Sequence, residues 1–284
     1  MASVRDIRQR IRSVRNTQKV TKAMKMVAAA KLRRAQERII QARPYAERML
    51  AVLNSLATRA QRESHPLLAE RGAGKIELVI ITADKGMCGG FNANIVKRAV
   101  SFMEENAGSV LTTQMIGRKG RDFFRRRRLQ ATGEHIELLR DLKYEQVAAI
   151  AREIMKRYIE CELDAVHVVY NEFKSVIQQR VVIEQLLPIR QLQFDEKVTV
   201  QDYIYEPSPE ELFDDLLPRH VEFQLLRAML ESAAAEFGAR MTAMDAATNN
   251  ATEMIDTLTL TMNRVRQAAI TKEIIEVVSG AEAT

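Results

Sequence analysis

The stretch that decides the fold is 237–269, which reads FGARMTAMDAATNNATEMIDTLTLTMNRVRQAA. Small or apolar residues recur in it at alternating steps of four and three, at Phe237, Met241, Met244, Thr248, Ala251, Ile255, Leu258, Met262, Val265 and Ala269. This spacing is typical of a helix that packs along a second helix over many turns. Pro209 and the two acidic residues after it predict where the helix begins, and Ser279-Gly280 predicts where it ends.

The partner of this helix is predicted at the other end of the chain, over 3–57. Small or apolar residues recur there with the same rhythm, apart from one extra step of four near Ala28. Pro44 lies inside the row and should kink the helix or end it early. A helix over 209–279 would be about 105 Å long and one over 3–57 about 80 Å, at ~1.5 Å per residue. We therefore expect an antiparallel coiled coil of the two terminal helices.

A helical bundle folded back on itself is the alternative to this coiled coil. It needs a turn inside 210–279, where the turn-forming residues are Gly238 and Asn249-Asn250. Because these are the only turn signals available there, the extended coiled coil is the favoured prediction.

The residues between the two helices have the pattern of an α/β domain. Short β-branched runs are expected as strands at 76–82, 110–116 and 165–170, helices at 91–105, 119–128 and 144–160, and an antiparallel strand at 179–187. Alternation of strand and helix favours a doubly wound, mostly parallel sheet. The predicted fold class is α/β, with a middle Rossmann-like, mostly parallel sheet and a long antiparallel coiled coil of the N- and C-terminal helices. The predicted domains are 1–58, 75–206 and 209–284.

The composition excludes several classes of protein. Of 284 residues, 5% are aromatic, 11 are Gly and 6 are Pro, which is too little turn chemistry for an all-β sandwich or barrel. No apolar run approaches the roughly 20 residues that a membrane-spanning helix needs. The charged first residues do not resemble a secretory signal. We expect a soluble intracellular protein.

The net charge of +6 is unevenly distributed along the chain. Residues 1–62 carry a net charge of +13, 63–208 are neutral, and 209–284 carry −7. A basic end and an acidic end predict that the two terminal helices meet. A basic coiled-coil arm that holds RNA is the competing interpretation, although an acidic partner helix would repel a phosphate backbone.

Candidate catalytic and metal sites are few. The loop 83–90 follows a strand and opens a helix, where phosphate-binding loops lie, but its glycines match neither GxGxxG nor GxxxxGK[ST]. A nucleotide-dependent enzyme that uses Gly86–Gly90 is therefore the second alternative. The four histidines are isolated from one another, and two cysteines are too few for a structural zinc site. We expect no catalytic residue, no cofactor and no metal site.

The last turns of the C-terminal helix do not suit a helix in water. They are apolar on more than one side, at Ile270, Ile274, Ile275, Val277 and Val278. The C-terminal helix is also expected to extend beyond its partner by roughly 15 residues, about 20 Å. Because an exposed apolar surface of this kind favours aggregation, we expect this tip to be inserted into an apolar sleeve of another protein.

Three motifs resemble the gamma subunit family of F-type ATP synthases. Residues 12–29, RSVRNTQKVTKAMKMVAA, are similar to the N-terminal helix of that family, and 270–283, ITKEIIEVVSGAEA, match its C-terminal signature. Residues 82–92, TADKGMCGGFN, resemble the loop after the first strand of its middle domain. Within the first motif Lys25 departs from the family, where this position is often acidic. The resemblance runs from end to end of the chain.

The resemblance implies a non-catalytic rotor shaft. In the family the coiled coil lies in the central cavity of a ring of three alpha and three beta subunits. The α/β domain joins the epsilon subunit and the membrane-embedded c ring, so the chain is peripheral to the cytoplasmic face of the bacterial cell membrane. Ion flow turns the c ring and the shaft, and ATP is made or hydrolysed on other subunits. No nucleic acid and no cofactor is implied.

The resemblance also implies roles for particular residues. The apolar tip, with Ile270, Ile274, Ile275, Val277 and Val278, would turn inside the sleeve formed by the ring. Arg266 and Gln267 match positions that engage a loop of one beta subunit. Met24 lies in the motif where the shaft meets a beta subunit, and Arg33 and Arg34 would face acidic loops of the beta subunits.

Overall fold

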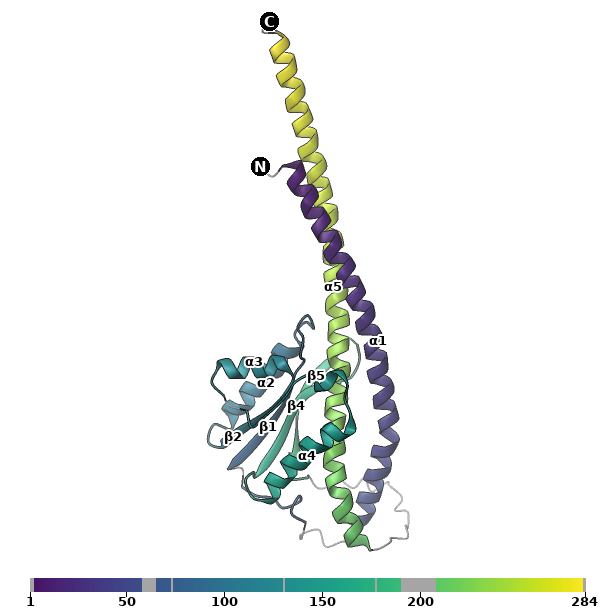
Figure 1. Cartoon of the computed structure of the whole chain (residues 1–284), viewed down its shortest axis with the longest axis vertical. Helices are drawn as coiled ribbons and strands as arrows, with labels where there is room; N and C mark the ends of the chain where they lie inside the picture. Colours follow the sequence, from purple (N-terminus) through teal and green to yellow (C-terminus); the bar gives the residue numbers. More distant parts are fainter. Residues whose placement is uncertain are drawn as a thin grey trace. The chain divides into compact units, whose positions relative to one another are not determined.

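A computed structural model describes residues 3–57, 65–72, 74–129, 131–176, 178–189 and 208–282. The chain divides into two compact units, one formed by Met1–Ala28 with Arg240–Thr284 and the other by Ala29–Ala239. Helices α1 (Val4–Ala57) and α5 (Pro209–Glu282) each contribute to both units (Figure 1). The predicted middle domain includes 190–206, which lie outside the described residues.

The two long helices differ in detail from the prediction. Helix α5 is continuous from Pro209 to Glu282, which excludes the folded-back bundle and extends the helix slightly beyond the predicted end at Ser279-Gly280. Helix α1 continues through Pro44 to Ala57, so the expectation that Pro44 would end it early was wrong.

In the first unit, α1 and α5 pack as an antiparallel pair. An apolar cluster joins Ile7, Ile11 and Val14 of α1 to Ile255, Leu258, Met262 and Val265 of α5. Further along, Gln18 Nε2 donates to Thr252 Oγ1 at 2.7 Å, and the hydroxyls of Thr21 and Thr248 are 2.8 Å apart. Residue numbers rise along α1 as they fall along α5, which confirms the predicted antiparallel pairing. Apart from Thr252, the α5 residues that meet α1 here belong to the predicted row of small or apolar residues.

The second unit contains a five-stranded mixed sheet with the strand order β3-β2-β1-β4-β5. Its strands are β1 (Lys75–Ile81), β2 (Val110–Ile116), β3 (Gly133–His135), β4 (Ala165–Phe173) and β5 (Gln179–Leu187). The first four strands pair in parallel and β5 is antiparallel to β4, which confirms the predicted topology. The helices between them are α2 (Phe91–Glu105), α3 (Arg118–Arg126), the 3-10 helix η2 (Leu138–Arg140) and α4 (Tyr144–Ile159).

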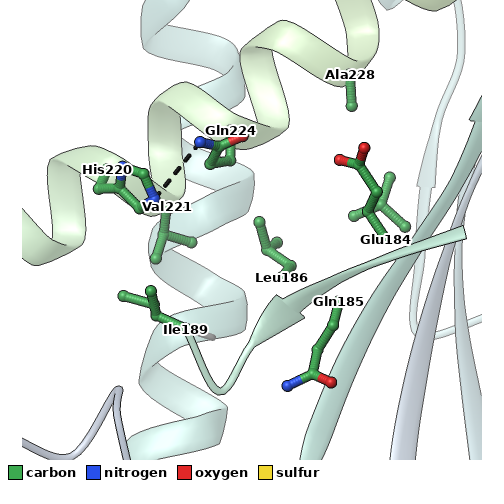
Figure 2. Close-up of a pocket in the computed structure, with 9 residues that line it drawn as sticks. Glu184, Gln185, Leu186, Ile189, His220, Val221, Gln224 and Ala228 are labelled. Carbon is green, nitrogen blue, oxygen red and sulfur yellow. Dashed lines mark hydrogen bonds between the residues drawn. The ribbon is translucent and has the colours of Figure 1, made fainter. Parts of the chain in front are cut away.

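Within this unit α5 packs beside β5. Figure 2 shows His220, Val221 and Gln224 of α5 on one side of a small cavity and Leu186 of β5 on the other. Nearby, Arg227 of α5 forms an ion pair with Glu184 of β5, with Nη2 and Oε2 2.5 Å apart. Helix α5 is thus joined to the edge strand of the sheet by a charged contact as well as by apolar packing.

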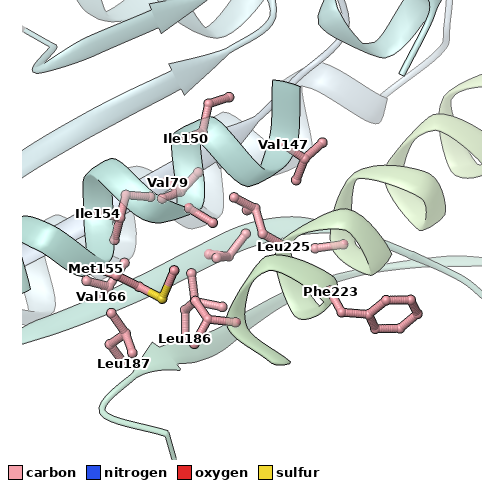
Figure 3. Packing of buried hydrophobic residues seen from close by; sticks show 14 of the residues in the cluster. Val79, Val147, Ile150, Ile154, Met155, Val166, Leu186, Leu187, Phe223 and Leu225 are labelled. Carbon is pink, nitrogen blue, oxygen red and sulfur yellow. The ribbon is translucent and has the colours of Figure 1, made fainter. Parts of the chain in front are cut away.

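The two faces of the sheet carry separate apolar cores. On one face, Leu78 and Ile80 of β1 pack with buried residues of α2 and α3, including Ile95 and Phe124. On the other face, Val79 packs in a cluster with residues of α4 and α5 (Figure 3), and the cluster also includes residues of α1. Successive residues of β1 point to opposite faces, so a near-continuous apolar run is what a strand covered on both sides requires.

Candidate functional site

The first residues of the loop 83–90, and Thr82 before it, are hydrogen-bonded to the start of α3 and to Glu137. The carboxylate of Asp84 accepts hydrogen bonds from the backbone N–H groups of Arg118 and Glu137, each at 3.0 Å. The next two amides of α3 donate to the Ala83 carbonyl and to Thr82 Oγ1, at 3.1 and 2.8 Å. Because these amides are occupied, the start of α3 offers no free donors to an anion beside the loop.

The cavity between β5 and α5 is also a poor candidate for an active site. Its volume is about 160 Å³, below the roughly 300 Å³ at which small-molecule sites begin. Burial lowers the pKa of His220, which lines it, to about 4, so this imidazole is neutral near pH 7. Within the described residues there is no group of three or more His, Cys, Asp or Glu that could hold a metal ion.

The apolar tip of α5, with Ile270, Ile274, Ile275, Val277 and Val278, is exposed in the first unit. The exposed fractions of its five large residues run from 49% for Ile270 to 72% for Val277. Ile255, on the paired part of the same helix, is only 9% exposed. Transfer of such side chains out of water is favourable by about 1.5–3 kcal/mol each, so the tip has the chemistry of a surface that another protein covers.

Arg266 and Gln267 lie directly before this tip. Val265 packs against the α1 cluster, whereas Arg266 and Gln267 are exposed. Their side chains are therefore available to a partner, next to the apolar tip.

The part of the chain that the structure describes has no helix long and apolar enough to cross a membrane.

The predicted residues of α1 differ in accessibility. Met24 is half-buried, whereas Arg33 and Arg34 are exposed. The Arg33 guanidinium forms an ion pair with Glu37 at 3.1 Å, yet its side chain remains 83% exposed. Lys25 is used within the chain, because its Nζ lies 2.5 Å from Asp245 Oδ1.

Several exposed apolar residues of the first unit were not predicted as partner contacts. They are Val20, Met26 and Val27 of α1 and Met254 and Leu260 of α5, all more than half exposed. The signal in the sequence is that each lies outside the heptad row and is nevertheless apolar. They extend the candidate interaction surface from the tip along the paired helices.

Comparison with solved structures identifies the class of protein. A chain in the central stalk and c-ring structure of the Tetrahymena thermophila mitochondrial ATP synthase matches with a TM-score of 0.61 and 27% identity, over 80% of this chain and 99% of that one. A chain of the Euglena gracilis mitochondrial ATP synthase, in the OSCP/F1/c-ring structure, matches with a TM-score of 0.69 and 20% identity, over 99% of this chain and 94% of that one. The fold is thus that of the central-stalk class of ATP synthase chains.

Sequence comparison then identifies the family. The family model described as ATP synthase matches residues 3–284. The ATP synthase gamma chains of Solibacter usitatus and of Anaeromyxobacter sp. strain Fw109-5 are 54% and 53% identical to this chain, over 100% of its length and 99% of theirs. The ATP synthase gamma chain of Geobacter sp. strain M21 is 49% identical, over 99% of both chains. The chain belongs to the ATP synthase gamma chain family.

Proposed function

We propose that this chain is the central rotor shaft of a bacterial F-type ATP synthase. It transmits ion-driven rotation of a c ring to a catalytic ring of alpha and beta subunits, for ATP synthesis or hydrolysis. Membership of the gamma chain family supports this function. The observation that carries it is the exposed apolar tip at Ile270–Val278, on a helix whose preceding residues are paired with α1.

The partners follow from this role. Three alpha and three beta subunits surround the terminal helices, and the middle domain, within 75–206, contacts the epsilon subunit and the c ring. The chain is then peripheral, on the cytoplasmic face of the cell membrane. It has no catalytic residue of its own and binds no cofactor and no nucleic acid; the ATP sites lie on other subunits. Solved neighbours that contain F1 and c-ring parts support this set of partners.

The tip acts as a bearing in this proposal. Ile270, Ile274, Ile275, Val277 and Val278 turn inside an apolar sleeve of the alpha and beta ring. Apolar contact is non-directional and roughly proportional to area, so it is retained at every rotational angle. Directional hydrogen bonds at the same place would have to break at each step, at about 0.5–1.5 kcal/mol each.

Polar residues beside the tip provide the contacts that depend on angle. Arg266 and Gln267 engage a loop of one beta subunit at a time. Arg33, Arg34 and Met24 of α1 meet beta subunits, where the two arginines pair with acidic loops. Exposure of the four polar side chains supports these assignments. Because such bonds are specific in geometry, they distinguish one rotational position from the next.

Reconstitution tests the function. Alpha and beta subunits of the same enzyme are mixed with and without this chain, and the complexes are separated by size and assayed for ATP hydrolysis. We expect one copy to join three alpha and three beta subunits and sustained hydrolysis to appear only in that assembly. Failure to form the complex would contradict the rotor function.

A charge substitution at the tip tests the bearing. Ile274→Asp with Ile275→Asp should leave the helical content of the free chain unchanged, because both side chains are more than half exposed. It should reduce assembly by about tenfold or more, since two apolar contacts become two desolvated carboxylates. The control is Ile159→Asp at the end of α4, which is 47% exposed and not part of the tip. Wild-type assembly and hydrolysis of the double variant would disprove the bearing.

A further inference from the structure

A groove between α2 and α3 belongs to the middle domain, and none of its residues has been given a role above. Both helices cover the same face of the sheet, and the groove between them has a volume of about 620 Å³ (Figure 1). Val96, Val100 and Phe123 supply its apolar part. Lys97, Lys119 and Arg127 stand beside them, and the Arg127 guanidinium lies 4.1 Å from the centre of the Phe123 ring.

The cations of this region fall into two groups. Three cations away from the groove are matched: Arg98 pairs with Glu105, Arg118 with Glu137 and Arg121 with Asp122, at 2.8, 3.2 and 2.7 Å, whereas Arg125, Arg126 and Arg128 have no ion pair with a described carboxylate. The three cations that line the groove have no ion pair with any described carboxylate. One acidic side chain, Glu104, also lines the groove. Three positive charges and one negative charge give the groove a formal charge of +2.

We propose that this groove docks an acidic amphipathic helix of another protein. The apolar face of that helix rests on the two valines and on Phe123, and its flanking carboxylates pair with the three cations. The proposal does not depend on the rotor function. It assigns a role to Arg127, one of four consecutive arginines at 125–128 at the end of α3 that the rotor function leaves unexplained.

The dimensions and chemistry of the groove favour a helix over other occupants. Helices α2 and α3 have 15 and 9 residues, so the groove is about 13–22 Å long, which matches two to four turns of an added helix. Helix-in-groove binding uses apolar anchors at i, i+3 or i+4, and i+7. Single-stranded nucleic acid would need open aromatic faces for stacking, whereas Arg127 already covers Phe123.

The test uses the full chain and a designed peptide as the probe. The peptide has 18 residues, Leu at i, i+3, i+4 and i+7 spacing, Glu on the flanks and a fluorescent label; a second peptide has Lys in place of each Glu. We expect saturable binding of the Glu peptide by anisotropy, with affinity at least about tenfold weaker for the Lys peptide. Equal binding of the two peptides, or none of either, would overturn the proposal.

Matched charge variants locate the binding site. Lys97→Glu with Lys119→Glu should weaken binding of the Glu peptide by about tenfold or more. Lys143→Glu with Lys156→Glu makes the same charge change at exposed positions before and within α4, on the other face of the sheet, and should leave binding within about twofold. If both pairs weaken binding equally, the peptide senses only net charge and the groove is not the site.

Val100→Thr separates the apolar contribution from charge, because it replaces an apolar side chain by a polar one of similar shape without adding a charge, and it should weaken binding with helical content unchanged. Vesicles of anionic phospholipid are the competing probe. Co-sedimentation with vesicles that is lost in the Lys97→Glu, Lys119→Glu variant, without saturable binding of the peptide, would assign the groove to a lipid surface and overturn the proposal. Concentration-dependent dimerisation that the same variant abolishes would likewise assign the groove to a second copy of the chain.

Discussion

Lys25 Nζ lies 2.5 Å from Asp245 Oδ1, which joins α1 to α5 between residues 220 positions apart in the sequence. The side chains are 40% and 47% exposed, so the pair lies at the edge of the helix seam. Exposed ion pairs of this kind contribute about 0–1 kcal/mol. Their larger effect in coiled coils is on register and partner orientation. We infer that this pair, with the Thr21–Thr248 hydrogen bond beside it, sets the register of α1 against α5.

Reversing one charge of this pair should destabilise the chain, and reversing both should restore it. Lys25→Asp places two carboxylates together and should lower the free energy of unfolding by about 1 kcal/mol. Asp245→Lys should act similarly, because it places two ammonium groups together. The double variant should return to within about 0.5 kcal/mol of wild type, measured by urea unfolding at low salt. Additive losses in the double variant would show that the two residues do not interact.

Gly117 is required by backbone geometry at the start of α3. Its φ is +93°, and a Cβ there would lie 2.0 Å from the Thr82 carbonyl oxygen. Since the Thr82 amide donates to the Ile116 carbonyl at 2.8 Å, this backbone cannot move aside freely. Gly117→Ala should therefore lower the free energy of unfolding by at least about 2 kcal/mol, measured by denaturant unfolding.

Gly108→Ala is the matched control for this prediction. No heavy atom lies within 4 Å of a Cβ at Gly108, and its φ is not positive. The substitution should change stability by no more than about 1 kcal/mol. Equal losses in Gly108→Ala and Gly117→Ala would contradict the geometric argument.

The terminal helices could be predicted because one rhythm determines both their conformation and their contacts. The row through Ile255 and Val265 is the row that packs on α1. The continuation of α1 through Pro44 could not be predicted from the sequence, because a helix tolerates an internal proline when tertiary packing offsets the lost hydrogen bond. Ala42 and Ala46 flank Pro44 and pack against the large core of the second unit.

Strand β3 was missed for a related reason. Gly133–His135 contains no β-branched residue, and its three residues become a strand through parallel pairing with β2, which no local pattern reveals. The exposed tip at Ile270–Val278 was visible, because apolar residues on several sides of a helix are themselves the signal. The sequence did not reveal the partner of Lys25 or the groove beside Phe123, since each depends on which helix faces meet.

Stability should decrease in mild acid because His220 is buried. Burial, together with the smaller effect of the nearby positive charge of Arg227, lowers the pKa of His220 from its ordinary 6.5 to about 4. The unfolded chain therefore binds a proton that the folded chain excludes, and stability is lost as pH falls from about 6.5 to about 4. The full loss is about 3 kcal/mol for a shift of this size.

Urea unfolding of His220→Gln at pH 7 and pH 4.5 measures this contribution. The variant should lose less stability than wild type between the two pH values. Burial also lowers the pKa values of His65 and His135, so part of the acid sensitivity remains. Ile189→Val changes the lining of the same cavity without a titratable group and should retain the wild-type difference. An unchanged pH dependence in His220→Gln would contradict the assignment.

Arg266 tests the angle-dependent contact of the proposed rotor. Arg266→Ala should leave the fold intact, because the side chain is exposed on α5, and should reduce coupled ATP synthesis and hydrolysis of the assembled enzyme. Loss of one charge-assisted hydrogen bond, about 1.5–3 kcal/mol, corresponds to roughly a tenfold to hundredfold effect if that bond limits a rotational step. Arg264→Ala is the control, since Arg264 is an exposed arginine two positions earlier, about 200° around the helix. Equal activity of both variants and wild type would show that Arg266 makes no such contact.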